Sequence, residues 1–176
     1  QEGASKSTLL EIADKLPFTL MLVANRWLVM ASADAAVETG DEILAVNGMK
    51  AADMITAMMP YLRADGSSDG KRLRQLSHNR GDFSQMDIIW PLLSPPRNGR
   101  YNVDIRRAAG KREALSVAAT TLAQRDRALA AQGIKPASEA WQFRIDGNTA
   151  FMTLPTFSVW KSDFDWAAFI DKAFAE

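Results

Sequence analysis

The stretch that decides the fold is Gly40-Asp41-Glu42-Ile43-Leu44-Ala45-Val46-Asn47-Gly48-Met49-Lys50. Its apolar run from Ile43 to Val46 is too short for a helix and lies between turn residues. That pattern is typical of a short buried strand. The dipeptide Asn47-Gly48 tolerates positive φ, so we expect a turn that ends the strand there.

A helix is predicted directly after this turn, from about residue 51 to residue 62. Apolar side chains recur there at i, i+3, i+4 and i+7, which indicates one buried helical face. These side chains are Ile55, Met58, Met59 and Leu62. Pro60 is expected to weaken the last turn of the helix.

The rest of the chain predicts three hairpins and several helices. Apolar runs with turn residues between them indicate hairpins over residues 18–31, 101–119 and 141–154. The capping-box pattern Thr8-Leu9-Leu10-Glu11 predicts a helix through about Lys15. Residues 71–93 fit two helical pieces broken near Gly81, and residues 121–132 fit a lightly packed connecting helix. Ser162-Asp163-Phe164-Asp165 is expected to cap a final helix with a wide apolar stripe.

The composition is that of an ordinary globular protein. Of 176 residues, 47% are hydrophobic and 24% are charged, which suits one compact domain or two small ones. The 21 Lys+Arg balance the 21 Asp+Glu, so no global field favours nucleic acid or a membrane surface. Acids outnumber cations between Asp34 and Asp69, and cations outnumber acids between Arg97 and Arg112. We expect two solvated faces that attract each other, not a nucleic-acid patch, which would need interleaved exposed aromatics.

Several classes of site are excluded or not expected. Without cysteine there is no disulfide, thiolate metal site or cysteine nucleophile. No apolar run is long enough for membrane insertion, and the first residues lack an initiator Met and a signal-type apolar core, so the chain looks trimmed. No glycine-rich phosphate loop occurs, and we expect no cofactor.

No residue of the chain forms a convincing catalytic or metal motif. His78 has no second metal-ligand residue at usual spacing and is expected to be a solvated helix residue. Ser158-Val159-Trp160-Lys161 has the Ser-x-x-Lys spacing of penicillin-recognising enzymes, but it precedes a helix and lacks the partner motifs, so we interpret it as coincidence. Four acids crowd one loop and are expected to be solvated. They are Asp34, Glu38, Asp41 and Glu42.

The order of parts carries a resemblance to a known family. Pro17-Phe18-Thr19-Leu20, a hairpin, the stretch from Gly40 to Gly48 and a following helix together resemble a PDZ-like domain. Asn148-Thr149-Ala150-Phe151-Met152-Thr153-Leu154-Pro155-Thr156-Phe157, followed by a capped helix, is similar to the tail-specific (carboxy-terminal processing) serine peptidases. The resemblance covers roughly residues 16–65 and 100–176.

The resemblance implies an α+β fold and a division of the chain. A helix at 1–16 would precede a PDZ-like, partly open β-barrel or sandwich with flanking helices at 17–121, carrying a helical insertion at about 66–97. A connecting helix or linker at 122–139 would lead to a hairpin and helix at 140–176, the start of an incomplete peptidase core. The family's serine nucleophile and lysine base belong to a motif that this chain lacks, so no catalytic residue is assigned.

What the resemblance does imply is a peptide groove. Leu16, Pro17, Phe18 and Thr19 match the carboxylate-binding loop, and Leu20 continues its strand. Ile55, Met58 and Met59 would offer side chains from the groove helix, although with Met54 these residues also fit a plain core. Pro17 lacks an N–H, and Lys15-Leu16 stand where the family has glycine, so a purely structural PDZ-like module remains an alternative.

The resulting hypothesis is a non-catalytic N-terminal fragment of an exported serine endopeptidase, in the periplasm, cell envelope or secreted fraction. Its partners would be peptide or protein C-terminal segments and the remaining catalytic core of the same polypeptide, with no nucleic acid. The alternative is a stand-alone PDZ-like interaction module without enzymatic activity. A small-ligand carrier is a third class, with no sequence pattern of a large cavity behind it.

Overall fold

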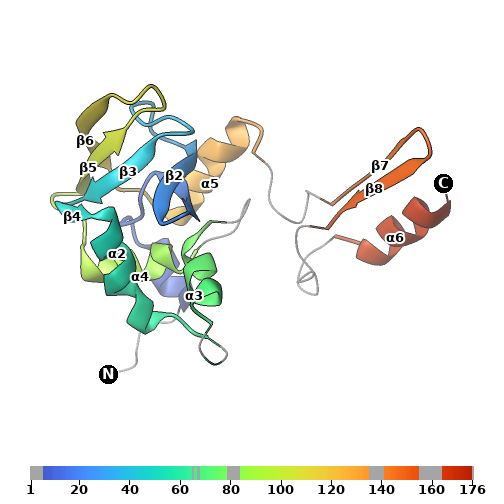
Figure 1. Ribbon diagram of the computed structural model, residues 1–176, viewed down its shortest axis with the longest axis horizontal. Helices are drawn as coiled ribbons and strands as arrows, with labels where there is room; N and C mark the ends of the chain where they lie inside the picture. Colours follow the sequence, from blue (N-terminus) through green and yellow to red (C-terminus); the bar gives the residue numbers. More distant parts are fainter. Residues whose placement is uncertain are drawn as a thin grey trace.

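A computed structural model describes residues 6–64, 66, 68–78, 84–134, 141–154 and 164–175. Its main feature is an antiparallel sheet with the strand order β1-β2-β3-β5-β6, in which β4 pairs with β3 (Figure 1). The strands are β1 (Phe18–Val23), β2 (Arg26–Ser32), β3 (Glu42–Val46), β4 (Met49–Lys50), β5 (Arg100–Arg106) and β6 (Arg112–Ala118). The sheet does not close into a barrel, and the predicted α+β class, with an open sheet and flanking helices, is confirmed.

The predicted strand in the stretch from Gly40 to Lys50 is β3, at the centre of the sheet. It pairs with β2 on one side and with β5 on the other, and most of its side chains are buried. The expected turn follows, with positive φ of 50° at Asn47 and 83° at Gly48. The Asn47 side chain also donates to the Ser94 hydroxyl and the Pro95 carbonyl, both at 3.1 Å. The turn therefore fixes the end of β3 against the segment that leads into β5.

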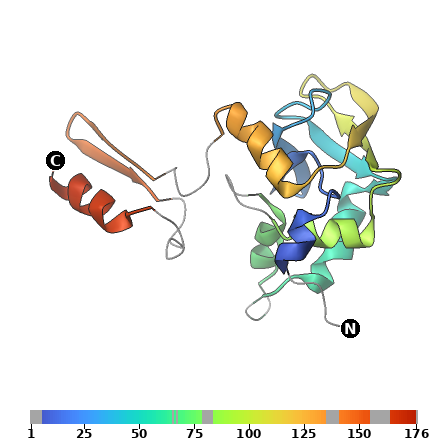
Figure 2. The same cartoon turned by 180° about the vertical axis from the view of Figure 1, so that it is seen from behind.

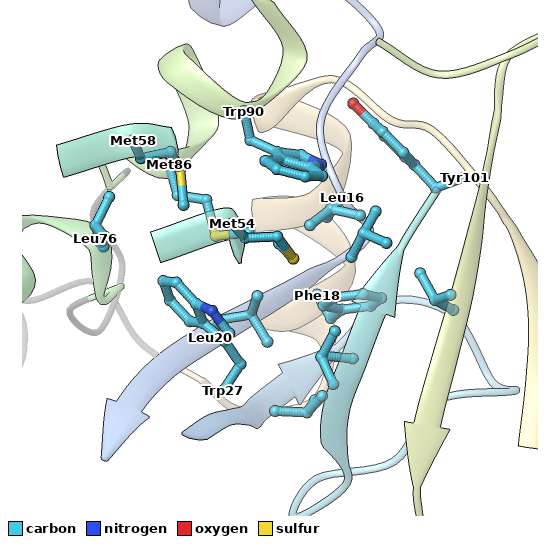
Figure 3. Packing of buried hydrophobic residues seen from close by; sticks show 14 of the residues in the cluster. Leu16, Phe18, Leu20, Trp27, Met54, Met58, Leu76, Met86, Trp90 and Tyr101 are labelled. Carbon is cyan, nitrogen blue, oxygen red and sulfur yellow. The ribbon is translucent and has the colours of Figure 1, made fainter. Parts of the chain in front are cut away.

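Helices cover this sheet and enclose the core. They are α1 (Lys6–Glu11), α2 (Ala51–Met58), a short 3-10 helix η1 (Met59–Tyr61), α3 (Asp69–Leu76), α4 (Met86–Leu93) and α5 (Leu122–Ala131). Pro60 lies in η1, so the helix predicted to residue 62 changes type there. Proline has no backbone N–H and cannot donate the hydrogen bond that would continue the α-helix. Figure 3 shows Met54 and Met58 of α2 above Phe18 and Leu20 of β1, with Trp90 of α4 in the same cluster.

The first helix was predicted with the wrong boundaries. It covers Lys6–Glu11, whereas the capping-box pattern predicted a helix that reaches Lys15. The cause is a bridge far along the chain: Lys15 donates its backbone N–H to the Thr120 carbonyl at 2.9 Å and accepts the Thr120 N–H at 3.0 Å. The Lys15 side chain is buried, and its Nζ donates to the Leu9 carbonyl at 2.7 Å.

Helix α5 contributes buried side chains to the same body. A capping box of Thr121 and Gln124 begins the helix. Arg125 and Leu129 are buried, and α5 contacts α1 and β2. The polar, alanine-rich pattern of residues 121–132 predicted a lightly packed connection, but a charged residue in the interior makes α5 part of the core architecture.

A second, smaller group of elements contains β7 (Gln142–Asp146), β8 (Thr149–Thr153) and α6 (Trp166–Ala175). The two strands pair as the predicted hairpin, and both Figure 1 and Figure 2 show this group beside the larger body. Trp141, Phe164 and Phe169 form a small aromatic cluster with ring centroids 5.3 to 6.0 Å apart. Ser162 and Asp163, predicted as caps of the last helix, lie outside the described residues, while Asp165 accepts the Ala168 N–H at 2.9 Å.

Candidate functional site

The candidate site is the outer edge of β1, the strand beside which the resemblance predicts that a peptide adds. β1 is an outer strand of the sheet, so some of its backbone groups point away from β2. The chain itself satisfies them: the His78 N–H donates to the Leu20 carbonyl at 2.8 Å, and the Leu20 N–H donates to His78 Nδ1 at 3.0 Å. The Leu22 N–H donates to the Ser77 hydroxyl at 3.0 Å. Two residues that follow α3 therefore occupy the position of an added strand.

Leu76 anchors this segment in the core. It is the one buried residue of α3, whose other side chains are partly or fully exposed. Figure 3 shows Leu76 at one end of the apolar cluster, toward Met58 and Met86. A large apolar side chain next to backbone groups bonded to a strand edge is how an extended peptide binds by strand addition.

The residues predicted to line the groove do come together, but inside the core. Leu16, Phe18, Leu20 and Met58 belong to one buried cluster, against which Ile55 and Met59 pack. Pro17 is also buried, and Thr19 is half-buried with its hydroxyl 3.4 Å from the Ala31 carbonyl. Leu16, Phe18, Leu20 and Met58 are thus buried, whereas Ile55, Met59 and Thr19 are partly exposed.

The predicted carboxylate-binding loop has its carbonyl groups engaged within the chain. The Leu16 carbonyl accepts a hydrogen bond from Arg125 at 3.3 Å, and the Pro17 carbonyl accepts the Ala33 N–H at 2.8 Å. The cation beside this loop already holds a carboxylate, because Arg125 binds both oxygens of Asp87 at 2.7 and 2.8 Å. Such a bidentate pair satisfies the guanidinium face that would otherwise attract a peptide terminus.

A buried polar cluster connects His78, which follows α3, with α4 and α5. The side chains of Asp87 and Arg125 are 3% and 0% exposed. Asp87 also accepts the Ser84 N–H at 3.1 Å and bonds His78 Nε2 at 3.0 Å. Burial alone would raise the pKa of the Asp87 carboxyl, but His78 and the Arg125 guanidinium hold that pKa well below its usual range. The cluster thus keeps an ionised carboxylate in the interior.

Ser84, His78 and Asp87 include the residue types of a catalytic triad but not its geometry. His78 Nδ1 faces the backbone of Leu20, and Nε2 faces both Asp87 at 3.0 Å and the Ser84 hydroxyl at 3.4 Å, so one ring nitrogen would have to serve both the carboxylate and the serine. A catalytic histidine needs a free nitrogen toward the serine and its donor nitrogen toward the carboxylate. All three side chains are buried. The arrangement positions α3 and cannot activate a nucleophile.

His78 was predicted to be solvated, and this was wrong. It is buried because its partners come from β1 and α4, 58 and 9 residues away in the sequence. One signal was available: Asp87 stands inside the apolar run Met86-Asp87-Ile88-Ile89-Trp90, and a charge in such a run needs a buried partner. No local pattern pairs Asp87 with Arg125, which lies 38 residues further along the chain.

The acidic and basic segments attract each other, as predicted. Arg106 bonds Glu42 at 2.6 Å and Arg107 bonds Asp41 at 2.7 Å, because β5 pairs with β3 and ends beside its start. Arg26 adds a second bond to Glu42 and, with Arg106, lowers the pKa of that carboxyl against the effect of burial. The expectation that Asp41 and Glu42 are solvated was wrong, since both are buried within these pairs.

Other candidate features lie elsewhere. Ser158 and Lys161 are outside the described residues. Among residues with a described position, no group of His, Asp and Glu could hold a metal ion. A search of the same residues finds no helix with the length and apolarity of a membrane span. A hollow of about 360 Å³ lies beside α6, between Trp141, Phe143, Phe169 and Lys172.

Comparison with known proteins finds a limited likeness. No family model and no curated protein matches the sequence. Solved structures of a protein named CPAF do match. Mature CPAF complexed with lactacystin has a TM-score of 0.43 and 21% identity, over 60% of this chain and 19% of that chain. Mature CPAF has a TM-score of 0.39 and 22% identity over the same shares. With the chain spanning 19% of these proteins and TM-scores below 0.5, the likeness assigns no activity.

Proposed function

We propose that this chain is the non-catalytic N-terminal region of an exported serine endopeptidase of the tail-specific class, with the body around β1–β6 as its PDZ-like module. The observation that carries the proposal is the position of the stretch from Gly40 to Lys50. It forms a central strand, a positive-φ turn at Asn47, and then α2, which contacts β2 and β3 and whose Met54 and Met58 belong to the same buried cluster as Phe18 and Leu20 of β1. This arrangement agrees with the motif order that resembles PDZ-like domains.

The hydrogen bonds of the polar side chains near β1 favour a structural role for this region, not a catalytic one. The described serine that contacts a histidine is Ser84, and His78 cannot act on it as a base. Arg125, which bonds the Leu16 carbonyl just before β1, is paired with the buried Asp87. Hydrolysis in this proposal is carried out by a serine and a lysine in another part of the same polypeptide.

The group of β7, β8 and α6 supports the same proposal. A two-stranded hairpin with one helix has little core of its own. Its aromatic cluster is small, and several large apolar side chains point to solvent: Ile145, Phe151, Trp166 and Phe174, the last 80% exposed. In the proposal this surface is the start of the catalytic domain and is covered by further strands and helices of that domain.

The test compares residues 1–176 with the full polypeptide encoded by the same gene. Both are incubated with an unfolded protein whose C-terminal residues are apolar, and cleavage is followed by mass spectrometry. The full polypeptide should cleave, and the purified fragment should not, even when Ser84 is intact. Cleavage by the fragment, or a full polypeptide without any hydrolytic activity, contradicts the proposal.

The alternative is a stand-alone module that binds peptides by strand addition. The observation that favours it is the set of β1 backbone groups with strand-like bonding along one edge. Occupation of this edge by Ser77 and His78 counts against it, because a stand-alone binder gains nothing from a filled site. A micromolar affinity of the unmodified chain for apolar C-terminal peptides would favour this alternative.

A further inference from the structure

We propose that Leu76, Ser77 and His78 are a built-in ligand that closes the β1 edge, and that an extended peptide with a large apolar side chain displaces them. This rests on the proposed PDZ-like role of the body around β1–β6, and it describes how access to the β1 edge is regulated. We refer to residues 76–78 as the plug.

The plug bonds the backbone of β1 where a neighbouring strand would, but mostly through its side chains. Only the bond from the His78 N–H to the Leu20 carbonyl joins two backbones. The N–H groups of Leu20 and Leu22 are instead satisfied by the side chains of His78 and Ser77. A peptide in extended conformation could replace both side-chain acceptors with its own carbonyl groups, so it would offer the edge the same number of bonds in a regular ladder.

The apolar contact of the plug defines the ligand. α3 carries charged residues along most of its length, and Leu76 is its single buried side chain. Helix α3 is attached to the body by Leu76, by the bonds of the two residues that follow it, and by Gln75, whose carbonyl accepts the Gln85 N–H at 2.9 Å and whose side chain donates to the Arg63 carbonyl at 2.6 Å. A segment with so few buried contacts belongs to the parts of a fold that open at low cost. The pocket vacated by Leu76 would accept a leucine-sized side chain.

The Asp87–Arg125 pair decides how the plug is held. Asp87 bonds the imidazole of His78 from α4, and Arg125 fixes Asp87 from α5. Opening the plug would break the bond between His78 Nε2 and Asp87, whereas the two bonds between Arg125 and Asp87 do not involve residues of the plug. Release of the plug and unfolding of the body are then separate events.

The test measures binding of a fluorescein-labelled peptide with the sequence of residues 71–78, by fluorescence anisotropy, to the chain 1–176. Leu76→Ala should bind this peptide at least about tenfold more tightly than the unmodified chain, since the competent state is more populated. Ser77→Ala, which removes only the bond to Leu22, should bind about threefold more tightly. Leu92→Ala, at an exposed leucine of α4, is the matched control and should bind as the unmodified chain does.

Two outcomes overturn the inference. One is equal binding, or no saturable binding, across the unmodified chain and both plug variants. The other is equal binding of a peptide in which alanine replaces the leucine that corresponds to Leu76. If circular dichroism shows that Leu76→Ala has not folded, Ser77→Ala decides. Because the readout is binding to residues 1–176, failure here is distinct from failure of the proposed peptidase role, which is read as hydrolysis by the full polypeptide.

Discussion

Replacing Asp87 with asparagine tests the buried ion pair that joins α4 and α5. The change keeps the shape of the side chain but removes its charge, while Arg125 remains completely buried with its guanidinium bonded at 2.7 and 2.8 Å. Removing one partner of a buried pair leaves an uncompensated charge and costs roughly 3–5 kcal/mol. Since a domain of this size is stable by about 5–15 kcal/mol, Asp87→Asn should lose a large part of its stability.

The assay is equilibrium urea unfolding, followed by the fluorescence of tryptophans that include Trp27 and Trp90 in the main core. Asp69→Asn is the matched control, because Asp69 pairs with Arg72 on the surface, with its side chain 69% exposed. That control should lose under about 1 kcal/mol. In the double variant Asp87→Asn/Arg125→Leu, the loss should be at least about 2 kcal/mol smaller than the sum of the two single losses. A loss below about 1 kcal/mol for Asp87→Asn, or additive losses, would refute the reasoning.

Three further predictions follow from individual contacts. The pKa of the Asp87 carboxyl is lowered in the folded state, so the ionised carboxylate stabilises the fold above the unfolded pKa of about 4, and this stabilisation is lost as the pH falls below that value. The urea midpoints of the unmodified chain should therefore fall more steeply from pH 5 to pH 2 than those of Asp87→Asn. Asn47→Ala places alanine at φ 50° and removes the bonds to Ser94 and Pro95, which should cost roughly 1–3 kcal/mol in urea unfolding, with Asn47→Gly costing less. Phe174→Ser should change stability by less than about 0.5 kcal/mol but raise solubility in ammonium sulfate precipitation, whereas Phe169→Ser, in contact with Trp141, should lower stability more.

The elements that could be predicted from the sequence are those specified by neighbouring residues. The strand from Ile43 to Val46 and its Asn47-Gly48 turn, together with the three hairpins, depend on local alternation and turn chemistry, and the structure contains them. The attraction between the acidic and basic segments could also be predicted, because the prediction needs only the signs of the charges.

The features that could not be predicted depend on contacts between distant parts of the chain. The end of α1 depends on the bridge between Lys15 and Thr120, which no local pattern encodes. The burial of His78 depends on β1 and α4, and that of Arg125 on Leu16, 109 residues away. The resemblance predicted which residues would surround a groove, but residues 77 and 78, which bond the edge of β1, lie in the region for which the resemblance offered no counterpart.

Amide hydrogen exchange at Leu20 and Leu22, resolved by NMR, tests most directly whether the chain closes its own β1 edge. Both N–H groups are donated to the residues after α3, to His78 Nδ1 and to the Ser77 hydroxyl, at 3.0 Å each. The account predicts that both amides are protected in the unmodified chain, and that protection at Leu22 falls in Ser77→Ala while protection within β3 is unchanged. Exchange of Leu20 and Leu22 at the rates of an open strand edge in the unmodified chain would contradict it.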